Sequence, residues 1–328
     1  MTETKGILIC GEVSGQETAP VTSELLRTGR MLSDKLKAPL NLLLTGQIAG
    51  EAGRKAIFQG ADKVFIADHP PFSDSAPEVY VNLAETLFRR ISPLLVLFGQ
   101  TDMGRDVAPR LAARLGASVC LDCIQIDIDP DTKNVIHTKP VYGGNAVAVW
   151  EAAATFPRIA TMRPRSGEAA AADTAREGEI IAFSADADLP AAKVRLLESV
   201  SEEIKGIKAE DAKVIVAGGG GIGGKEGFEL VDELARLLRG AVGTTRVPSD
   251  EGWMPKSFEI GQTGHMVSPD LYIAVGISGA PQHLAGCSGS KVIVAINRDP
   301  EAHIFKEADF GIVGDYREAL PTLIKFLS

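Results

Sequence analysis

Short apolar runs that alternate with amphipathic segments constrain the fold of this chain more than any other feature of its sequence. Up to Leu115, apolar residues between these runs recur every three or four positions. The runs are Gly6–Cys10, Leu40–Leu44, Val64–Ala67 and Leu94–Phe98, and the helical faces are Leu25/Gly29/Leu32/Leu36, Val79/Leu83/Leu87/Ile91 and Val107/Leu111/Leu115. Because strands that are apolar on both sides need cover on both faces, the alternation predicts a parallel sheet between two layers of helices.

The pattern changes between Ser118 and Met162, where strand-like pieces follow one another without helices. The pieces read SVCLDCIQI, NVIHTKPVY, AVAVWEA and RIATMRP. We expect them to form an antiparallel extension of the sheet. Residues 163–190 are rich in Ala, Gly, Glu and Asp and show little periodicity, which is typical of a connector, with room for one more strand at Ile180–Phe183.

A second alternation of strands and helices starts after Glu203. Its first strand, Ala212–Ala217, leads into a glycine-rich turn and then into the helical pattern Phe228–Leu238. Further strands are expected at Ala241–Val242, Leu271–Val275, Val292–Ile296 and Gly311–Val313. A chain of 328 residues favours about two domains. We predict two Rossmann-like α/β domains, residues 1–202 and residues 203–328.

The charge balance excludes one large class of partners. The chain carries 34 Lys and Arg against 43 Asp and Glu, a formal net charge of −9, and no basic cluster. We therefore expect no nucleic acid as a partner, and no stretch is long and apolar enough for membrane insertion. The N-terminal MTETKGILICGE lacks the features of a signal peptide, which predicts a cytoplasmic protein.

Two of the four cysteines, Cys120 and Cys123, have CxxC spacing. A structural zinc site would need a second pair of ligands, which the sequence lacks. A redox CxxC lies at the start of a helix, whereas this segment has the pattern of a strand. We interpret the pair as two half-buried thiols and expect no metal.

The run AKVIVAGGGGIGGKEGF contains G-x-G-x-x-G twice, between a strand and a helix. Glycines there would let a phosphate approach the backbone at the start of the helix. The next strand ends in Thr244-Thr245-Arg246 instead of the Asp or Glu that would bind a ribose hydroxyl. An Arg at that point is compatible with an NADP site, so an NADP-dependent reductase stays open at this point.

A second strand–turn–helix sequence, LYIAVGISGAPQHLAG, is a stronger candidate for a diphosphate site. Gly276, Ser278 and Gly279 keep its turn narrow and polar, and Pro281 suits a first helical turn. His283 lies just inside the helix. A lone His is usually a surface or capping residue, but this strand–helix corner favours a functional role.

Two further loops carry polar side chains that could close a cleft. Gln262 and Thr263 stand between two glycines in GQTGHMVSPDLY, where they could stabilise a tight turn or present an amide and a hydroxyl to a heteroaromatic ring. Asn297 and Asp315 follow the last two predicted strands. Such residues usually make turns.

These residues carry a resemblance that covers nearly the whole chain. The segment from Gly240 to Asp315 resembles the FAD domain of electron transfer flavoprotein α subunits, and GQTDMGRDVAPRLAARLGASVCLDC, YGGNAVA and IATMRP resemble the same family. The resemblance implies an N-terminal adenine-nucleotide α-hydrolase-like sheet that contacts a β subunit, and a C-terminal parallel-sheet domain that holds FAD.

The resemblance also assigns cofactor-binding roles to individual residues. Thr245, Arg246, Gln262 and Thr263 match positions near the isoalloxazine ring, and His283 matches one near its pyrimidine oxygens. The remaining matches are Ser278 and Gln282 along the flavin and ribityl chain, Asn297 and Asp315 at the adenosine part, and Gly220, Gly276 and Gly279 in the turns. The family often has Arg where Gly220 stands, so one cation near the cofactor is missing.

No nucleophile–base pair is evident, so we expect no catalytic side chains and a cofactor that carries the chemistry. The resemblance implies that the chain is an electron-transfer subunit and that this cofactor is FAD. The resemblance implies a heterodimer with a β subunit, electron donors such as acyl-CoA dehydrogenases of fatty acid β-oxidation, and a quinone reductase or another acceptor. Membership of an NADH-dependent bifurcating oxidoreductase complex is also compatible with it. The alternatives are the NADP-dependent reductase, which predicts no bound chromophore, and a non-redox adenine-nucleotide-binding module.

Overall fold

The computed structural model of the chain describes residues 6–14, 17–46, 49–67, 77–129, 131–142, 146–152, 157–184, 194, 197 and 207–327. The chain forms two compact units, residues 1–140 with 147–199 and residues 141–146 with 200–328. The predicted domain boundary after residue 202 lies outside the described residues and stays a prediction.

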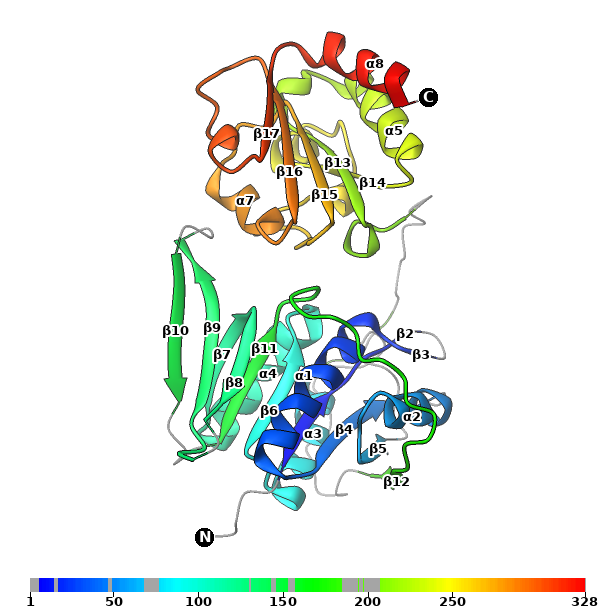
Figure 1. The fold of residues 1–328 in the computed structure, drawn as a ribbon, viewed down its shortest axis with the longest axis vertical. Helices are drawn as coiled ribbons and strands as arrows, with labels where there is room; N and C mark the ends of the chain where they lie inside the picture. The colour runs from blue at the N-terminus through cyan, green and yellow to red at the C-terminus, as the bar shows by residue number, and fades with distance from the viewer. Residues whose placement is uncertain are drawn as a thin grey trace. The chain divides into compact units, whose positions relative to one another are not determined.

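The first unit is built on a seven-stranded sheet with the order β12-β5-β4-β1-β6-β11-β7 (Figure 1). Its strands are β1 (Ile7–Cys10), β4 (Leu40–Thr45), β5 (Lys63–Ala67), β6 (Leu95–Gly99), β7 (Ser118–Cys123), β11 (Arg158–Met162) and β12 (Glu179–Phe183). All neighbouring pairs are parallel, which confirms the predicted sheet, and β12 confirms the strand expected at Ile180–Phe183.

Helices cover both faces of this sheet, as the periodicity predicts. Helices α1 (Pro20–Leu36) and α2 (Ala49–Phe58) pack on one face, α1 through Leu25 and Leu32 and α2 through Ala56 and Ile57. Helices α3 (Pro77–Ile91) and α4 (Asp102–Leu115) pack on the other through Leu83, Leu87 and Val107. Strands β2 (Val13–Ser14) and β3 (Glu17–Thr18) form a small antiparallel hairpin.

The predicted antiparallel extension over 118–162 is wrong in part. Strands β7 and β11 belong to the main sheet, where they run parallel to each other. Only the pieces between them, β8 (Gln125–Ile128), β9 (Val135–Val141) and β10 (Ala146–Ala152), form a separate three-stranded sheet, in which β8 and β9 are antiparallel. Alternation along one strand identifies the strand but not its partner, so pairing between segments far apart in sequence was missed.

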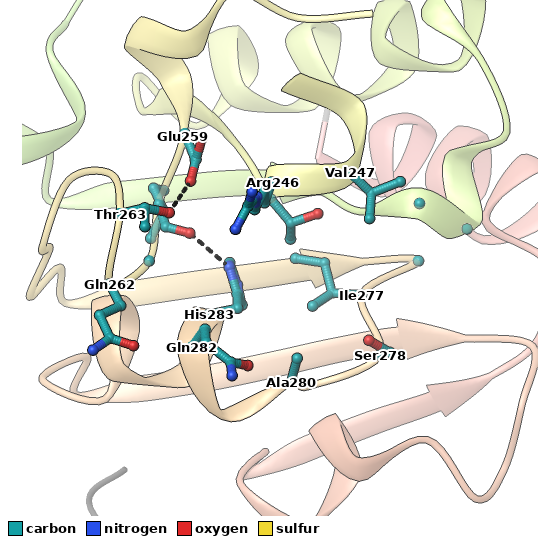
Figure 2. Close-up of a pocket in the computed structure, with 16 residues that line it drawn as sticks. Arg246, Val247, Glu259, Gln262, Thr263, Ile277, Ser278, Ala280, Gln282 and His283 are labelled. Carbon is teal, nitrogen blue, oxygen red and sulfur yellow. Dashed lines mark hydrogen bonds between the residues drawn. The ribbon is translucent and has the colours of Figure 1, made fainter. Parts of the chain in front are cut away.

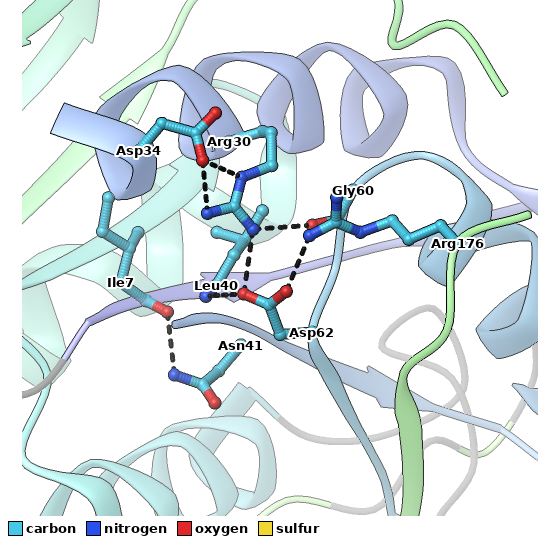
Figure 3. Close-up of polar contacts among 8 residues, drawn as sticks. All are labelled: Ile7, Arg30, Asp34, Leu40, Asn41, Gly60, Asp62 and Arg176. Atoms are coloured by element: carbon cyan, nitrogen blue, oxygen red, sulfur yellow. Dashed lines mark hydrogen bonds and ion pairs between the residues drawn. The ribbon is translucent and has the colours of Figure 1, made fainter. Parts of the chain in front are cut away.

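A half-buried carboxylate joins three parts of the first unit (Figure 3). Asp62 pairs with Arg30 of α1 at 2.8 Å and with Arg176 of the connector at 2.6 Å. It also accepts a hydrogen bond from the backbone N–H of Leu40. Although burial raises the pKa of Asp62, these donors outweigh it and lower the pKa. The connector is thereby fixed on the sheet over its described residues.

The second unit is a five-stranded parallel sheet with the order β14-β13-β15-β16-β17. Its strands are β13 (Val214–Gly218), β14 (Ala241–Thr244), β15 (Leu271–Val275), β16 (Val292–Asn297) and β17 (Phe310–Val313), each within two residues of its predicted position. Helices α5 (Phe228–Leu237) and α8 (Tyr316–Leu327) cover one face and α7 (Pro281–Cys287) the other. The short helix α6 (Arg246–Asp250) follows β14.

The four cysteines are free and buried, so the pair Cys120 and Cys123 is more deeply buried than we expected. Among the described residues, no helix has the length and apolar character needed to cross a membrane. Within the same residues, His, Cys, Asp and Glu form no group of three that could hold a metal ion.

Candidate functional site

A cavity of about 410 Å³ opens at the carboxyl ends of the strands of the second unit. Gly218 at the end of β13 pairs with Thr244 on one side and with Val275 on the other, so the loops after these strands meet at one edge. Ligands of open parallel sheets bind at this edge. The cavity is lined by Gly220, Gly221, Thr245, Arg246, Val247, Glu259, Ile260, Gly261, Gln262, Thr263, Gly276, Ile277, Ser278, Ala280, Gln282 and His283.

Most of the predicted site residues lie around this cavity (Figure 2). It brings together Gly220, Thr245, Arg246, Gln262, Thr263, Gly276, Ser278, Gln282 and His283. Asn297 and Asp315 instead line a smaller hollow, which shares Gly221 and Gly276 with the cavity. Gly279 lines neither. Its φ is +85° and a Cβ would lie 2.3 Å from the backbone nitrogen of Ile304, so its turn packs against the chain around Ile304.

Backbone forms one wall of the cavity because two glycine loops touch there. The N–H of Gly221 donates to the carbonyl of Gly276 at 2.9 Å. A Cβ on Gly221 would lie 2.8 Å from that carbonyl oxygen, and a Cβ on Gly276 would lie 2.9 Å from the carbonyl carbon of Gly221. Gly276 also has φ +61°, which side chains disfavour. Side chains at these positions would collide with the backbone of the facing loop and force the two loops apart.

Arg246 is the only Lys or Arg among the described residues that line the cavity. It begins α6, directly after Thr245, and pairs through Nε with the Oδ2 of Asp250 at 3.1 Å. Its side chain is 71% exposed, so solvent screens its charge until a ligand covers it.

His283 lines the cavity, and both nitrogens of its ring are engaged. Its ring is buried, and Nδ1 lies 2.9 Å from the carbonyl oxygen of Ile260, to which it must donate. Nε2 lies 3.0 Å from the hydroxyl of Tyr272 and accepts from it in the neutral ring. Burial lowers the pKa of His283 to about 4. The imidazole is therefore neutral near pH 7.

Besides Arg246, the exposed polar side chains of the cavity are those of Gln262, Thr263, Ser278 and Gln282. The loop that carries the first two is held to α7, because the N–H of Gln262 donates to the carbonyl of Gln282 at 2.8 Å. In the smaller hollow, the Nδ2 of Asn297 donates to the carbonyl of Ile277, and its Oδ1 accepts from the N–H of Asp299. That amide thus has a structural role of its own.

Sequence reasoning missed two residues of the site. Tyr272 is fully buried on β15 and holds the ring of His283. Glu259 lines the cavity with only 2% of its surface exposed, and its Oε1 accepts a hydrogen bond from the hydroxyl of Thr263 at 2.6 Å (Figure 2). An isolated Glu before GQTG carries no local signal of burial, so neither position could be found from spacing alone.

Known proteins resemble the chain over nearly its full length. The profile of the electron transfer flavoprotein domain matches residues 7–188, and that of the electron transfer flavoprotein FAD-binding domain matches residues 208–288. The electron transfer flavoprotein subunit alpha of Thermoanaerobacterium thermosaccharolyticum is 39% identical, with 99% of this chain and 98% of that protein covered. The corresponding subunit of Bacillus subtilis is 41% identical over 97% of this chain and 96% of that protein.

A relative with a different name is also similar. The lactate dehydrogenase (NAD(+),ferredoxin) subunit LctC of Acetobacterium woodii is 32% identical, with 98% of this chain and 77% of that protein covered.

Proposed function

Because the chain belongs to the family of electron transfer flavoprotein α subunits, we propose that it binds one FAD non-covalently in the cavity of its second unit. The electron-transfer role comes with the family. Its finer form is that the chain accepts electrons from dehydrogenases, such as acyl-CoA dehydrogenases, and passes them to a quinone reductase or another acceptor.

The observation that carries this proposal is the cavity at the carboxyl edge of the parallel sheet. Its volume of about 410 Å³ lies within the range of small-molecule sites and suits a heteroaromatic ring with its polar chain. The close contact between Gly221 and Gly276 leaves no room for a Cβ at either position and gives the cavity a wall made of backbone. Exposed amide and hydroxyl groups face the opening, so the residues present fit a flavin nucleotide.

FAD supplies the one-electron and two-electron chemistry when it is bound. The chain's own residues would bind and orient it. Gln262, Gln282 and Ser278 offer donors and acceptors to its polar edges, and Arg246 would offer a positive charge where reduction adds negative charge. No Cys lines the cavity among the described residues and both nitrogens of His283 are engaged, which supports non-covalent binding.

We further propose that residues 203–328 form the FAD domain and that residues 1–202 contact a β subunit in a heterodimer. Exposed apolar side chains on β10 support such a contact, because Val147, Val149 and Trp150 are 57%, 68% and 41% exposed. Apolar surface of this kind often marks an interface. A stable monomer with normal flavin affinity and electron transfer would contradict the heterodimer.

The electron donor is tested with the complex of the chain and its β subunit. We expect an acyl-CoA to reduce the bound flavin in the presence of an acyl-CoA dehydrogenase. The reduction is measured as bleaching of the absorption bands of oxidised flavin. Lactate with a lactate dehydrogenase is the comparison suggested by the relative LctC. If the flavin is reduced with lactate and lactate dehydrogenase but not with the acyl-CoA pair, the proposed donor is wrong. If the chain binds NADP and no flavin, the proposed function is wrong.

A further inference from the structure

The cavity contains a buried acid for which the proposed function has no role. Glu259 is held by its backbone at several points, since its N–H donates to the carbonyl of Lys256 at 3.0 Å and its carbonyl accepts from the N–H of His265 at 2.7 Å. It also forms an isolated bridge with Thr244. The carboxylate therefore has a fixed place in the cavity wall.

The hydrogen bond from Thr263 brings no positive charge to Glu259. No Lys, Arg or His side chain of the described residues forms an ion pair with Glu259. Arg246, the one Lys or Arg on the described lining of the cavity, is paired with Asp250 and largely exposed. A buried charge acts more strongly on its surroundings than a solvent-screened one. Solvent therefore screens the negative charge of Glu259 poorly and the positive charge of Arg246 well.

We propose that Glu259 lowers the midpoint potential of the cofactor that the cavity binds. The inference rests on the proposed function, in that the cofactor is FAD. Electron uptake makes the flavin more negative, and a fixed carboxylate in the same cavity opposes this change. The reduced cofactor is therefore bound less tightly, relative to the oxidised one, than it would be beside a neutral residue.

The test is spectroelectrochemical titration of bound FAD in the full complex at one pH and ionic strength. Glu259→Gln keeps the shape of the side chain and removes its charge, whereas Glu259→Asp keeps the charge. Glu229→Gln is the matched control, because it removes one negative charge from an exposed position on α5 outside the cavity lining. FAD content and the unfolding temperature are measured first for each variant.

We expect Glu259→Gln to raise the midpoint potential, equivalent to a shift of roughly tenfold in the ratio of the two FAD dissociation constants. The midpoint potential of Glu259→Asp should be lower than that of Glu259→Gln, and the midpoint potential of Glu229→Gln should equal that of the parent protein. A potential that is unchanged or lower in Glu259→Gln would overturn the inference while leaving the proposed function intact. A parent complex that binds no FAD would instead refute the proposed function itself.

Discussion

The contact between the two glycine loops predicts a graded response to alanine substitution. Gly276 has φ +61° and is crowded by the backbone of Gly221, Gly221 is crowded without a positive φ, and Gly223 has φ +80° with open space around it. The three positions therefore separate two costs, namely that of the left-handed backbone and that of steric overlap.

The expected magnitudes follow from these two costs. A left-handed backbone costs an ordinary residue roughly 1–2 kcal/mol. Overpacking of a methyl group costs about 1–3 kcal/mol. Gly223→Ala should thus destabilise the second unit by about 1–2 kcal/mol and Gly221→Ala by about 1–3 kcal/mol, whereas Gly276→Ala should cost about 2–5 kcal/mol because both terms act.

The assay is urea unfolding followed by the fluorescence of Trp253 in a Trp150→Phe background. The chain has two Trp residues, and each unit contains one of them, so Trp253 reports on the second unit. The affinity for FAD is measured on the same variants. If Gly276→Ala lowers the free energy of unfolding no more than Gly223→Ala does, the two loops can move apart at little cost. Their contact then does not determine the shape of the cavity.

Three further predictions concern ionisable groups. Burial raises the pKa of Glu24 to about 7 from 4.5, so the folded state loses stability as pH rises between these values; Glu24→Gln should raise the unfolding temperature at pH 8 but not at pH 4, and an equal gain at both would contradict this. The ring nitrogens of His283 should keep constant ¹⁵N NMR shifts between pH 6 and pH 8, since its pKa is lowered to about 4; a titration midpoint near 6.5 would refute the buried, neutral ring. Arg246→Gln should lower the midpoint potential of bound FAD, by less at high salt; an unchanged potential at equal FAD content would show that Arg246 does not act on the flavin.

The elements that the sequence predicted are those with a local signal. The alternation of apolar runs and helical faces placed β1, β4, β5 and β6 to within one residue and the strands of the second unit to within two, because burial on a sheet or a helix face repeats along the chain. The pairing of β11 between β6 and β7 has no such signal, since it depends on contacts between segments distant in sequence. The C-terminal helix α8 was also not predicted.

The same distinction holds for the cavity. Gln262, Ser278 and Gln282 were predicted because they lie in turns next to strands and resemble a known family, and the structure places them around one cavity. The burial of Glu259 and the engagement of His283 by Tyr272 and Ile260 depend on three or more segments meeting in space. A sequence pattern does not show which hydrogen-bonding groups of a side chain are already engaged by residues from other segments of the folded chain.

The central claim is that the cavity of the second unit holds one FAD, and stoichiometric cofactor analysis tests it most directly. The complex with the β subunit is stripped of cofactor and reconstituted with FAD, and bound FAD per α chain is measured after denaturation, for the parent protein and for Gly276→Ala. We predict one FAD per chain in this cavity for the parent and weaker binding in the variant, in which the new methyl group collides with the backbone of Gly221 and displaces the cavity wall. A folded parent complex that stays colourless after reconstitution would contradict the account. So would a Gly276→Ala complex that binds FAD as tightly as the parent complex.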